Sequence, residues 1–209
     1  MFISFEGIEG SGKSTVMAAI ARALRAEGRE VVLAHEPGGT PVGDAARDIL
    51  LHKRDMAISP LTELMLMNAS RAQLVADVIR PALARGAVVL CDRYAHSSLA
   101  YQGYGRGIPL EIVRAVCDAA TSGLWPDLTL LIDVSYETSR ARLSDRGRAH
   151  DRMEREEEAF HRRIRDGYLA MANGEERVVR IDGERAPEEV TDAALAALSG
   201  IMGHDRSEV

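Results

Sequence analysis

The residue types with the clearest chemistry stand at positions 7–14, where the sequence reads GIEGSGKS and fits the pattern GxxxxGK[ST] in full. The glycines let the backbone curl with its N–H groups inward, which forms a phosphate nest at the positive end of a following helix. Lys13 can reach the β and γ oxygens of a triphosphate, and the Ser14 hydroxyl can ligate Mg²⁺. A merely flexible glycine-rich loop is the alternative interpretation. The predicted contacts of a bound nucleoside triphosphate are Gly7, Glu9, Gly10, Ser11, Gly12, Lys13, Ser14 and Thr15.

A second group with chemical potential follows the apolar run at residues 88–91, where the chain reads Asp92-Arg93-Tyr94. At the end of a central strand, Asp92 can hold the shell of a Mg²⁺ ion, and Arg93 can project into the cleft as a cation between two phosphate groups. The sequence lacks the NKxD-type segment of a GTPase and the apolar run ending in Asp-Glu of a motor or transporter ATPase. The pattern therefore favours phosphoryl transfer between two bound nucleotides.

These residues need a sheet to position them, and the hydrophobic periodicity predicts one. Short, β-branched or aromatic runs bounded by Gly, Pro or charge indicate strands at 2–6, 30–34, 87–91, 128–134 and 177–182. Helical spacing occupies 13–27, 61–84 and 110–120. Strands joined by long helices predict an α/β fold of the P-loop type, with a five-stranded, mostly parallel sheet covered on both faces and ligands beyond the carboxyl ends of the strands.

Composition fits one soluble enzyme domain spanning residues 1–209. The chain is 46% hydrophobic and 28% charged, and its net charge of −6 argues against a broad nucleic-acid-binding face. Cys91 and Cys117 lie in apolar stretches without metal-ligand spacing, which is typical of buried thiols in a reducing compartment. No segment reaches the ~18 apolar residues of a membrane span, so we expect a cytoplasmic protein with no membrane contact. Residues 203–209 look like a loose polar tail.

The segment from Arg140 to Arg165 is crowded with Arg and Glu and is interrupted at Gly147. This composition is compatible with a solvated pair of charged helices or with a lid over phosphates. Composition alone favours the solvated helices.

Four motifs in order resemble the bacterial thymidylate kinases: FEGIEGSGKST at 5–15, EPGGT at 36–40, DRY at 92–94 and AYQG at 100–103. The resemblance spans most of the chain. It implies an enzyme that uses ATP and Mg²⁺ to phosphorylate thymidine monophosphate (dTMP) to the diphosphate. It also implies a homodimer, formed through the long helices around 61–84.

On the donor side, the resemblance makes residues 140–153 a small lid. Because this P-loop has no internal arginine, the lid must supply the cation for the transition state. We expect Arg152 to do so, with Arg146 and Arg148 assisting, and Arg142 to stack on adenine. Together with Lys13, Asp92 and Arg93 these are the predicted catalytic and donor-binding side chains.

On the acceptor side, the resemblance places Glu9 near the sugar hydroxyl, Arg71 on a thymine carbonyl, Arg93 on the acceptor phosphate and Tyr101 under the deoxyribose. From the residues alone, Glu9 could equally face solvent, Arg71 could be a surface cation and Tyr101 could be a core side chain. Pro37 resembles a cis-proline turn of the family. The predicted acceptor site is Glu9, Glu36, Pro37, Met67, Arg71, Arg93, Ser98, Tyr101, Gln102 and Tyr168.

Met67 departs from the family, which usually has an aromatic ring there to stack on thymine. A thioether can lie against a base without ring-on-ring contact, or Met67 can simply be helix core. This departure keeps open a kinase for another nucleoside monophosphate or small acceptor. A non-catalytic nucleotide-binding regulator is a further alternative, although Lys13, Ser14, Asp92 and Arg93 are all present.

Overall fold

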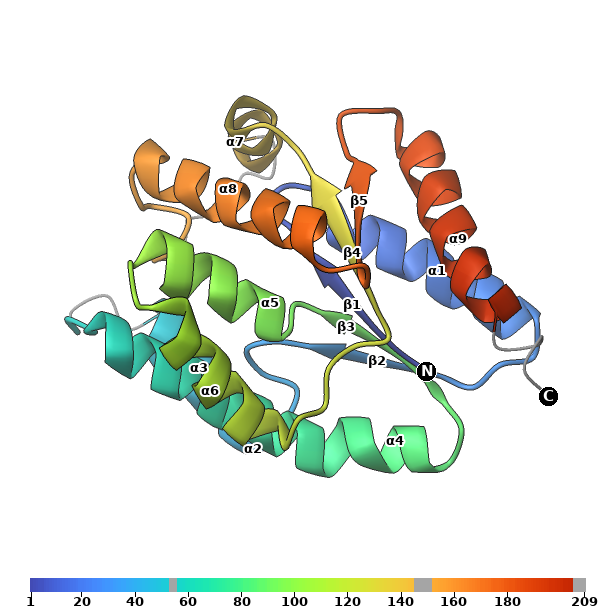
Figure 1. Ribbon diagram of the computed structural model, residues 1–209, viewed down its shortest axis with the longest axis horizontal. Coiled ribbons are helices and arrows are strands. Elements are labelled where there is room, and N and C mark those ends of the chain that lie inside the picture. Colours follow the sequence, from blue (N-terminus) through green and yellow to red (C-terminus); the bar gives the residue numbers. More distant parts are fainter. Residues whose placement is uncertain (53–55, 145–151, 205–209) are drawn as a thin grey trace.

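A five-stranded parallel sheet forms the centre of the computed structural model, which describes residues 1–52, 56–144 and 152–204 (Figure 1). The strand order is β2-β3-β1-β4-β5, and each neighbouring pair is parallel. The strands are β1 Phe2–Glu6, β2 Val31–His35, β3 Val88–Asp92, β4 Leu128–Asp133 and β5 Val178–Asp182. Each lies within one residue of its predicted bounds, so the parallel α/β prediction is confirmed.

Helices cover both faces of this sheet. On one face α1 (Lys13–Ala26) lies beside α9 (Pro187–His204), and their apolar side chains pack on those of β1, β3 and β4 (Figure 1). The other face carries α3 (Pro60–Leu74), α6 (Leu110–Thr121) and α8 (Glu158–Gly174), which contribute Leu64, Val113 and Ile164 to a second core cluster. Among the described helices, none combines the length and apolarity needed to cross a membrane.

The helix predicted over 61–84 is present but irregular. It begins at Pro60, where the Ser59 side chain accepts a hydrogen bond from the Thr62 N–H at 3.2 Å. It then changes to a π-helical turn, η2 (Val75–Ile79), and continues as α4 (Arg80–Ala84). Pro81 accounts for the irregular turn, because it has no N–H and its ring clashes with the carbonyl four residues earlier.

Two short helical segments that the periodicity did not predict follow β2 and β3. The first is α2 (Pro41–Arg47) with the π-helical turn η1 (Asp48–His52), and the second is α5 (Ala95–Ser98) with η3 (Leu99–Gly105). Thr40 caps α2 by accepting from the Gly43 N–H at 3.0 Å, and Pro41 stands in the first turn. A Thr-Pro pair is a helix-start signal, so α2 could have been recognised from the sequence.

The charged segment contains the helix α7 (Tyr136–Ser144) and the start of α8, with residues 145–151 outside the described part. Helices therefore lie at both ends of the charged segment, in agreement with the interpretation as a pair of charged helices. At the C-terminus α9 extends to His204, two residues into the segment predicted as a loose tail. That prediction was wrong for 203–204, because the helix runs further than its sequence pattern indicated.

Candidate active site at the carboxyl ends of the strands

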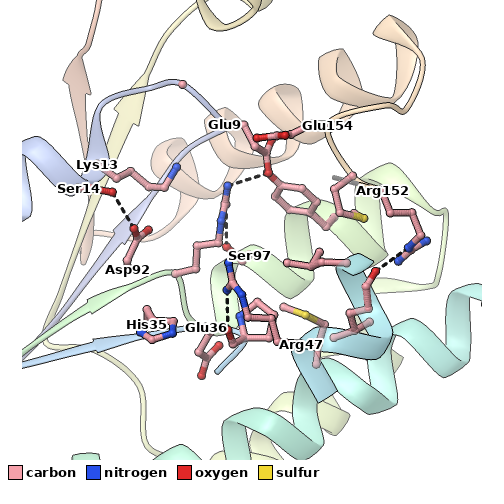
Figure 2. Close-up of a pocket in the computed structure, with 18 of the residues that line it drawn as sticks. Glu9, Lys13, Ser14, His35, Glu36, Arg47, Asp92, Ser97, Arg152 and Glu154 are labelled. Atoms are coloured by element: carbon pink, nitrogen blue, oxygen red, sulfur yellow. Dashed lines mark hydrogen bonds and ion pairs between the residues drawn. The ribbon is translucent and has the colours of Figure 1, made fainter. Parts of the chain in front are cut away.

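A cavity of about 360 Å³ opens where β1, β2 and β3 end. Its walls come from the loop between β1 and α1, from η1, α3 and η3, and from the residues just after 151 (Figure 2). This is the edge at which parallel sheets of this type bind ligands. The sequence prediction of where to look for a site is thus matched by a hollow of suitable size.

The loop between β1 and α1 has the backbone shape that its glycines allow. Gly7 has φ +137°, and a Cβ atom there would lie 2.4 Å from the Ile132 carbonyl oxygen, so no other residue fits. The Lys13 ammonium lies inside the curl of the loop and donates to the Gly7 and Ile8 carbonyl oxygens at 2.9 and 3.0 Å. The loop therefore presents a buried cation at the start of α1.

Burial and the nearby Arg93 guanidinium lower the pKa of Lys13 to about 8, while Asp92 acts in the opposite direction. A lysine in this state carries most of its charge near neutral pH but loses it under mildly alkaline conditions. A phosphate group close to its Nζ would stabilise the charged form.

The predicted metal ligands are neighbours. The Ser14 hydroxyl donates to Asp92 Oδ2 at 3.1 Å, which joins the first turn of α1 to the end of β3 (Figure 2). Within the described residues, no cluster of three or more His, Cys, Asp or Glu side chains could hold a metal. One carboxylate and one hydroxyl fit Mg²⁺, which takes few protein ligands and completes its shell with water and phosphate oxygens.

Arg93 joins the loop to the rest of the cavity. Its φ of +71° lies in the left-handed region, unusual for a residue with a side chain. The guanidinium donates to the Gly7 carbonyl at 3.0 Å and to Glu9 Oε1 at 2.9 Å, and it lies 5.0 Å from the centre of the Tyr101 ring. The side chain is only 14% exposed, so its charge acts in a largely dry environment.

Glu9 and Tyr101 line the cavity together. The Tyr101 hydroxyl donates to Glu9 Oε1 at 2.6 Å, while Glu9 Oε2 is buried and has no hydrogen-bond partner among the described residues. Burial would raise the pKa of Glu9, but Arg93, Lys13 and the Tyr101 hydroxyl together lower it, so the carboxylate is ionised. The alternative of a solvent-facing Glu9 is therefore wrong. Tyr101 is both buried and at the cavity wall.

Two predicted acceptor residues lie behind the wall of the cavity. The Arg71 guanidinium forms a fully buried ion pair with Glu36 at 2.7 Å and also donates to the Ser98 hydroxyl at 3.0 Å. Glu36 lines the cavity, but Arg71 and Ser98 do not. The surface-cation alternative for Arg71 is wrong, because the side chain has no exposed area. The contact of Arg71 with the acceptor base stays a prediction.

Of the remaining predicted acceptor residues, some line the cavity and one lies behind its wall. Pro37, Met67 and Gln102 line the cavity, and the Glu36–Pro37 peptide bond is cis as the resemblance implied. Tyr168 does not line it. Its hydroxyl instead donates to the buried Glu6 carboxylate at 2.9 Å and accepts from Arg93 at 3.3 Å. Tyr168 therefore supports Arg93 from behind.

Two side chains of this region, Glu6 and Arg47, were not predicted from the sequence. Glu6, at the end of β1, accepts from the Tyr94 N–H at 2.8 Å and from the Ser97 hydroxyl at 2.5 Å, which fixes the segment after β3. Arg47 lines the cavity and donates to the Pro37 carbonyl at 2.7 Å. A charged residue ending a buried strand could have flagged Glu6, whereas Arg47 carries no such signal.

Arg152 is the described member of the predicted lid arginines, since Arg146 and Arg148 lie outside the described residues. Its guanidinium contacts Glu63 Oε2 at 2.6 Å and the Leu50 carbonyl at 2.8 Å. Figure 2 shows it across the cavity from Lys13. In this arrangement Arg152 lies in the wall opposite the phosphate loop, and its catalytic role stays a prediction.

A second cavity of about 240 Å³ also borders the phosphate loop, and Gly10, Gly12 and Thr15 line both cavities. Its lining includes Arg142, whose guanidinium donates to the Gly183 carbonyl at 3.0 Å and to the Ser11 carbonyl at 3.3 Å. Arg142 thus borders a space that adjoins the loop, and its stacking on adenine stays a prediction.

Comparisons with known proteins agree with this geometry. The family model described as Thymidylate kinase matches residues 5–194. A thymidylate kinase of Deinococcus radiodurans is 46% identical over 205 residues, covering 98% of each chain, and one of Thermosynechococcus vestitus is 47% identical over 95% of this chain and 87% of its own. The crystal structure of an Ehrlichia chaffeensis thymidylate kinase superposes with a TM-score of 0.75 at 33% identity, covering 95% of this chain and 98% of that one. The chain belongs to the thymidylate kinase family.

Proposed function

We propose that this protein transfers the γ-phosphate of ATP to dTMP, with residues 1–209 acting as one nucleoside monophosphate kinase domain. The observation that carries the proposal is the shared cavity, which has the Lys13 loop at one end and Arg93, Tyr101 and Gln102 further along its walls. A donor phosphate at the Lys13 loop and an acceptor nucleotide beside Arg93 and Tyr101 would meet within the same cavity. Family membership supports the same reaction.

In the proposed reaction an oxygen of the acceptor phosphate attacks the γ-phosphorus, and the bond to the bridging oxygen of the β-phosphate breaks to release ADP. Lys13 neutralises charge on the donor, and Arg93 holds the acceptor phosphate in line with it. Mg²⁺, held by Ser14 and Asp92, would neutralise the charge on the β and γ oxygens. Ionised Glu9 cannot donate, so it would accept a hydrogen bond from a sugar hydroxyl.

The cavity also favours a particular acceptor base. Gln102 Oε1 is buried and has no hydrogen-bond partner in the part of the chain that the structure describes, and Gln102 lines the cavity together with Met67. An unpaired acceptor of this kind is best satisfied by an N–H group, such as N3–H of thymine. Met67 offers an apolar surface for the base. These contacts support thymine although the aromatic ring typical of the family is missing.

A homodimer is part of the proposal. Leu61 and Met65 on α3 are 51% and 50% exposed, and Leu110 and Ile112 at the start of α6 are 38% and 45% exposed. The two helices pack against each other, so these side chains belong to neighbouring elements. Large apolar side chains grouped in this way are typical of protein interfaces, and a second copy of the chain is the occupant we propose.

The test is a coupled assay of ADP release over a panel of dTMP, dUMP, dCMP and dGMP. We expect dTMP to give the highest kcat/KM. Equal values for all four would contradict the preference for dTMP and favour a kinase that acts on another acceptor. No ADP release with any acceptor, under conditions where ATP binds, would favour a non-catalytic nucleotide-binding regulator. Arg152→Ala, assayed beside the parent, tests the lid assignment, because full turnover in this variant would contradict it.

A further inference from the structure

Glu63 is a buried carboxylate on α3 that lines the cavity, and no motif in the sequence singles it out. It is 1% exposed. Its Oε1 accepts from Gln102 Nε2 at 2.8 Å, and its Oε2 accepts from Arg152 at 2.6 Å and from Arg106 at 3.1 Å. Arg106 Nε makes a longer contact of 3.3 Å to Oε1. One carboxylate therefore joins η3, the segment after 151, and the acceptor end of the cavity.

The arrangement fixes which way the Gln102 amide faces. An ionised carboxylate can only accept hydrogen bonds, so the NH₂ group of Gln102 must point to Glu63. Burial would raise the pKa of Glu63, but hydrogen bonds from Gln102, Arg106 and Arg152 lower it, which keeps the carboxylate ionised. The oxygen of the amide then points away from Glu63. Within the described part of the chain this buried oxygen has no hydrogen-bond partner, and Gln102 is one of the residues that line the cavity.

We propose that Glu63 is a positioning residue for base selectivity, which acts by orienting the amide of Gln102. With its oxygen toward the acceptor base, Gln102 accepts from the N3–H of thymine or uracil. Cytosine has a lone pair at N3 instead of a hydrogen, so two acceptors would face each other and its binding is disfavoured. The inference rests on the proposed function, because it assumes that the acceptor base lies against Gln102.

The geometry predicts what replacing Glu63 by glutamine would do. The single oxygen of the new side chain is required by Arg152 and Arg106 on the Oε2 side. Its NH₂ group must then occupy the Oε1 position and face Gln102, at the cost of the 3.3 Å contact from Arg106. Gln102 can satisfy that new donor only by turning its oxygen toward it. The turn presents NH₂ to the cavity, which matches the N3 lone pair of cytosine.

The experiment measures kcat/KM for dTMP, dUMP and dCMP in the parent and in Glu63→Gln. We expect the ratio of dTMP to dCMP to fall by about tenfold or more, because the turned amide would face the N3–H of thymine with a donor. The ratio of dTMP to dUMP should stay unchanged, because both bases carry N3–H. Glu156→Gln is the matched control. It removes the other carboxylate that Arg106 contacts, at 2.7 Å, without touching Gln102, so selectivity should be retained.

An equal loss for all three acceptors in Glu63→Gln would overturn the inference, because it would indicate a purely structural role. Should this variant not fold, a crystal structure of the parent with dTMP decides the matter. Gln102 Oε1 within hydrogen-bond distance of N3, with Nε2 still on Glu63, supports the proposal, and any other orientation refutes it. A parent that phosphorylates none of the acceptors would remove the proposed function first, and this inference with it.

Discussion

The buried ammonium of Lys13 leads to a measurable pH dependence of ATP binding. With a pKa of about 8, Lys13 is roughly nine tenths protonated near pH 7 and roughly one tenth protonated near pH 9. If the triphosphate binds well only to the charged form, the apparent Kd for ATP rises about tenfold over this interval. The folding stability of the ATP-free protein, in contrast, increases with pH. Because the unfolded chain keeps the Lys13 proton up to the ordinary lysine value of 10.5, folding becomes more favourable as the pH rises from about 8.

Isothermal titration of ATP into the protein at a series of pH values would measure this dependence directly. Proton uptake on binding, obtained by repeating the titration in buffers of different ionisation enthalpy, should be largest above the pKa of Lys13. Lys13→Arg is the informative control, because a guanidinium stays charged across the range. Its affinity for ATP, whatever its value, should not vary with pH. A parent whose ATP affinity is constant up to about pH 9.5 would show that the loop does not bind phosphate through a titrating Lys13.

Three further outcomes follow from the contacts of the site and of the fold. Arg93→Lys should lower kcat/KM for dTMP by about 30-fold or more, because one ammonium cannot keep both the Gly7 carbonyl and Glu9 contacts, and each hydrogen bond to a charged group contributes roughly 1.5–3 kcal/mol. Asp92→Asn should raise the Mg²⁺ concentration that gives half-maximal activity by about tenfold or more, measured by metal titration. Glu175→Gln should destabilise the protein at neutral pH, measured by urea unfolding, since a hydrogen bond from His96 lowers the pKa of Glu175 to about 2.

Each of these outcomes has a result that would contradict it. A value of kcat/KM for Arg93→Lys within about threefold of the parent would mean that Arg93 does not hold the acceptor. An unchanged Mg²⁺ requirement would remove Asp92 from the metal site. For Glu175, the stabilisation is present above the unfolded pKa of about 4.5 and is lost as the pH falls toward 2. The difference between parent and variant should therefore shrink across that interval, and a constant difference would refute the argument.

The sheet was predictable because its strands are short, apolar and bounded by clear breaks. All five agree with their predicted bounds to within one residue. The phosphate loop was predictable for a related reason, since its function requires particular residue types at consecutive positions. Lys13 meets the Gly7 carbonyl within this one loop, and the parallel sheet brings Asp92, at the end of a predicted strand, to the Ser14 hydroxyl.

The acceptor side was harder to predict, because its geometry depends on contacts between residues far apart in the chain. Arg71 is withdrawn from the cavity by Glu36, which lies 35 residues earlier. Glu63 meets Arg152 across 89 residues, and no local pattern indicates that pairing. The irregular turns of η3 place Tyr101 and Gln102, and such π-helical turns have no periodicity that a sequence pattern could detect.

The most direct test of the central claim is a crystal structure with a non-hydrolysable ATP analogue and dTMP bound together. The triphosphate should lie on the backbone amides of residues 7–14 with Lys13 Nζ at its γ-phosphate, and the dTMP phosphate should contact Arg93 in line with it. A triphosphate bound away from that loop, or a dTMP phosphate beyond the reach of Arg93, would contradict the account.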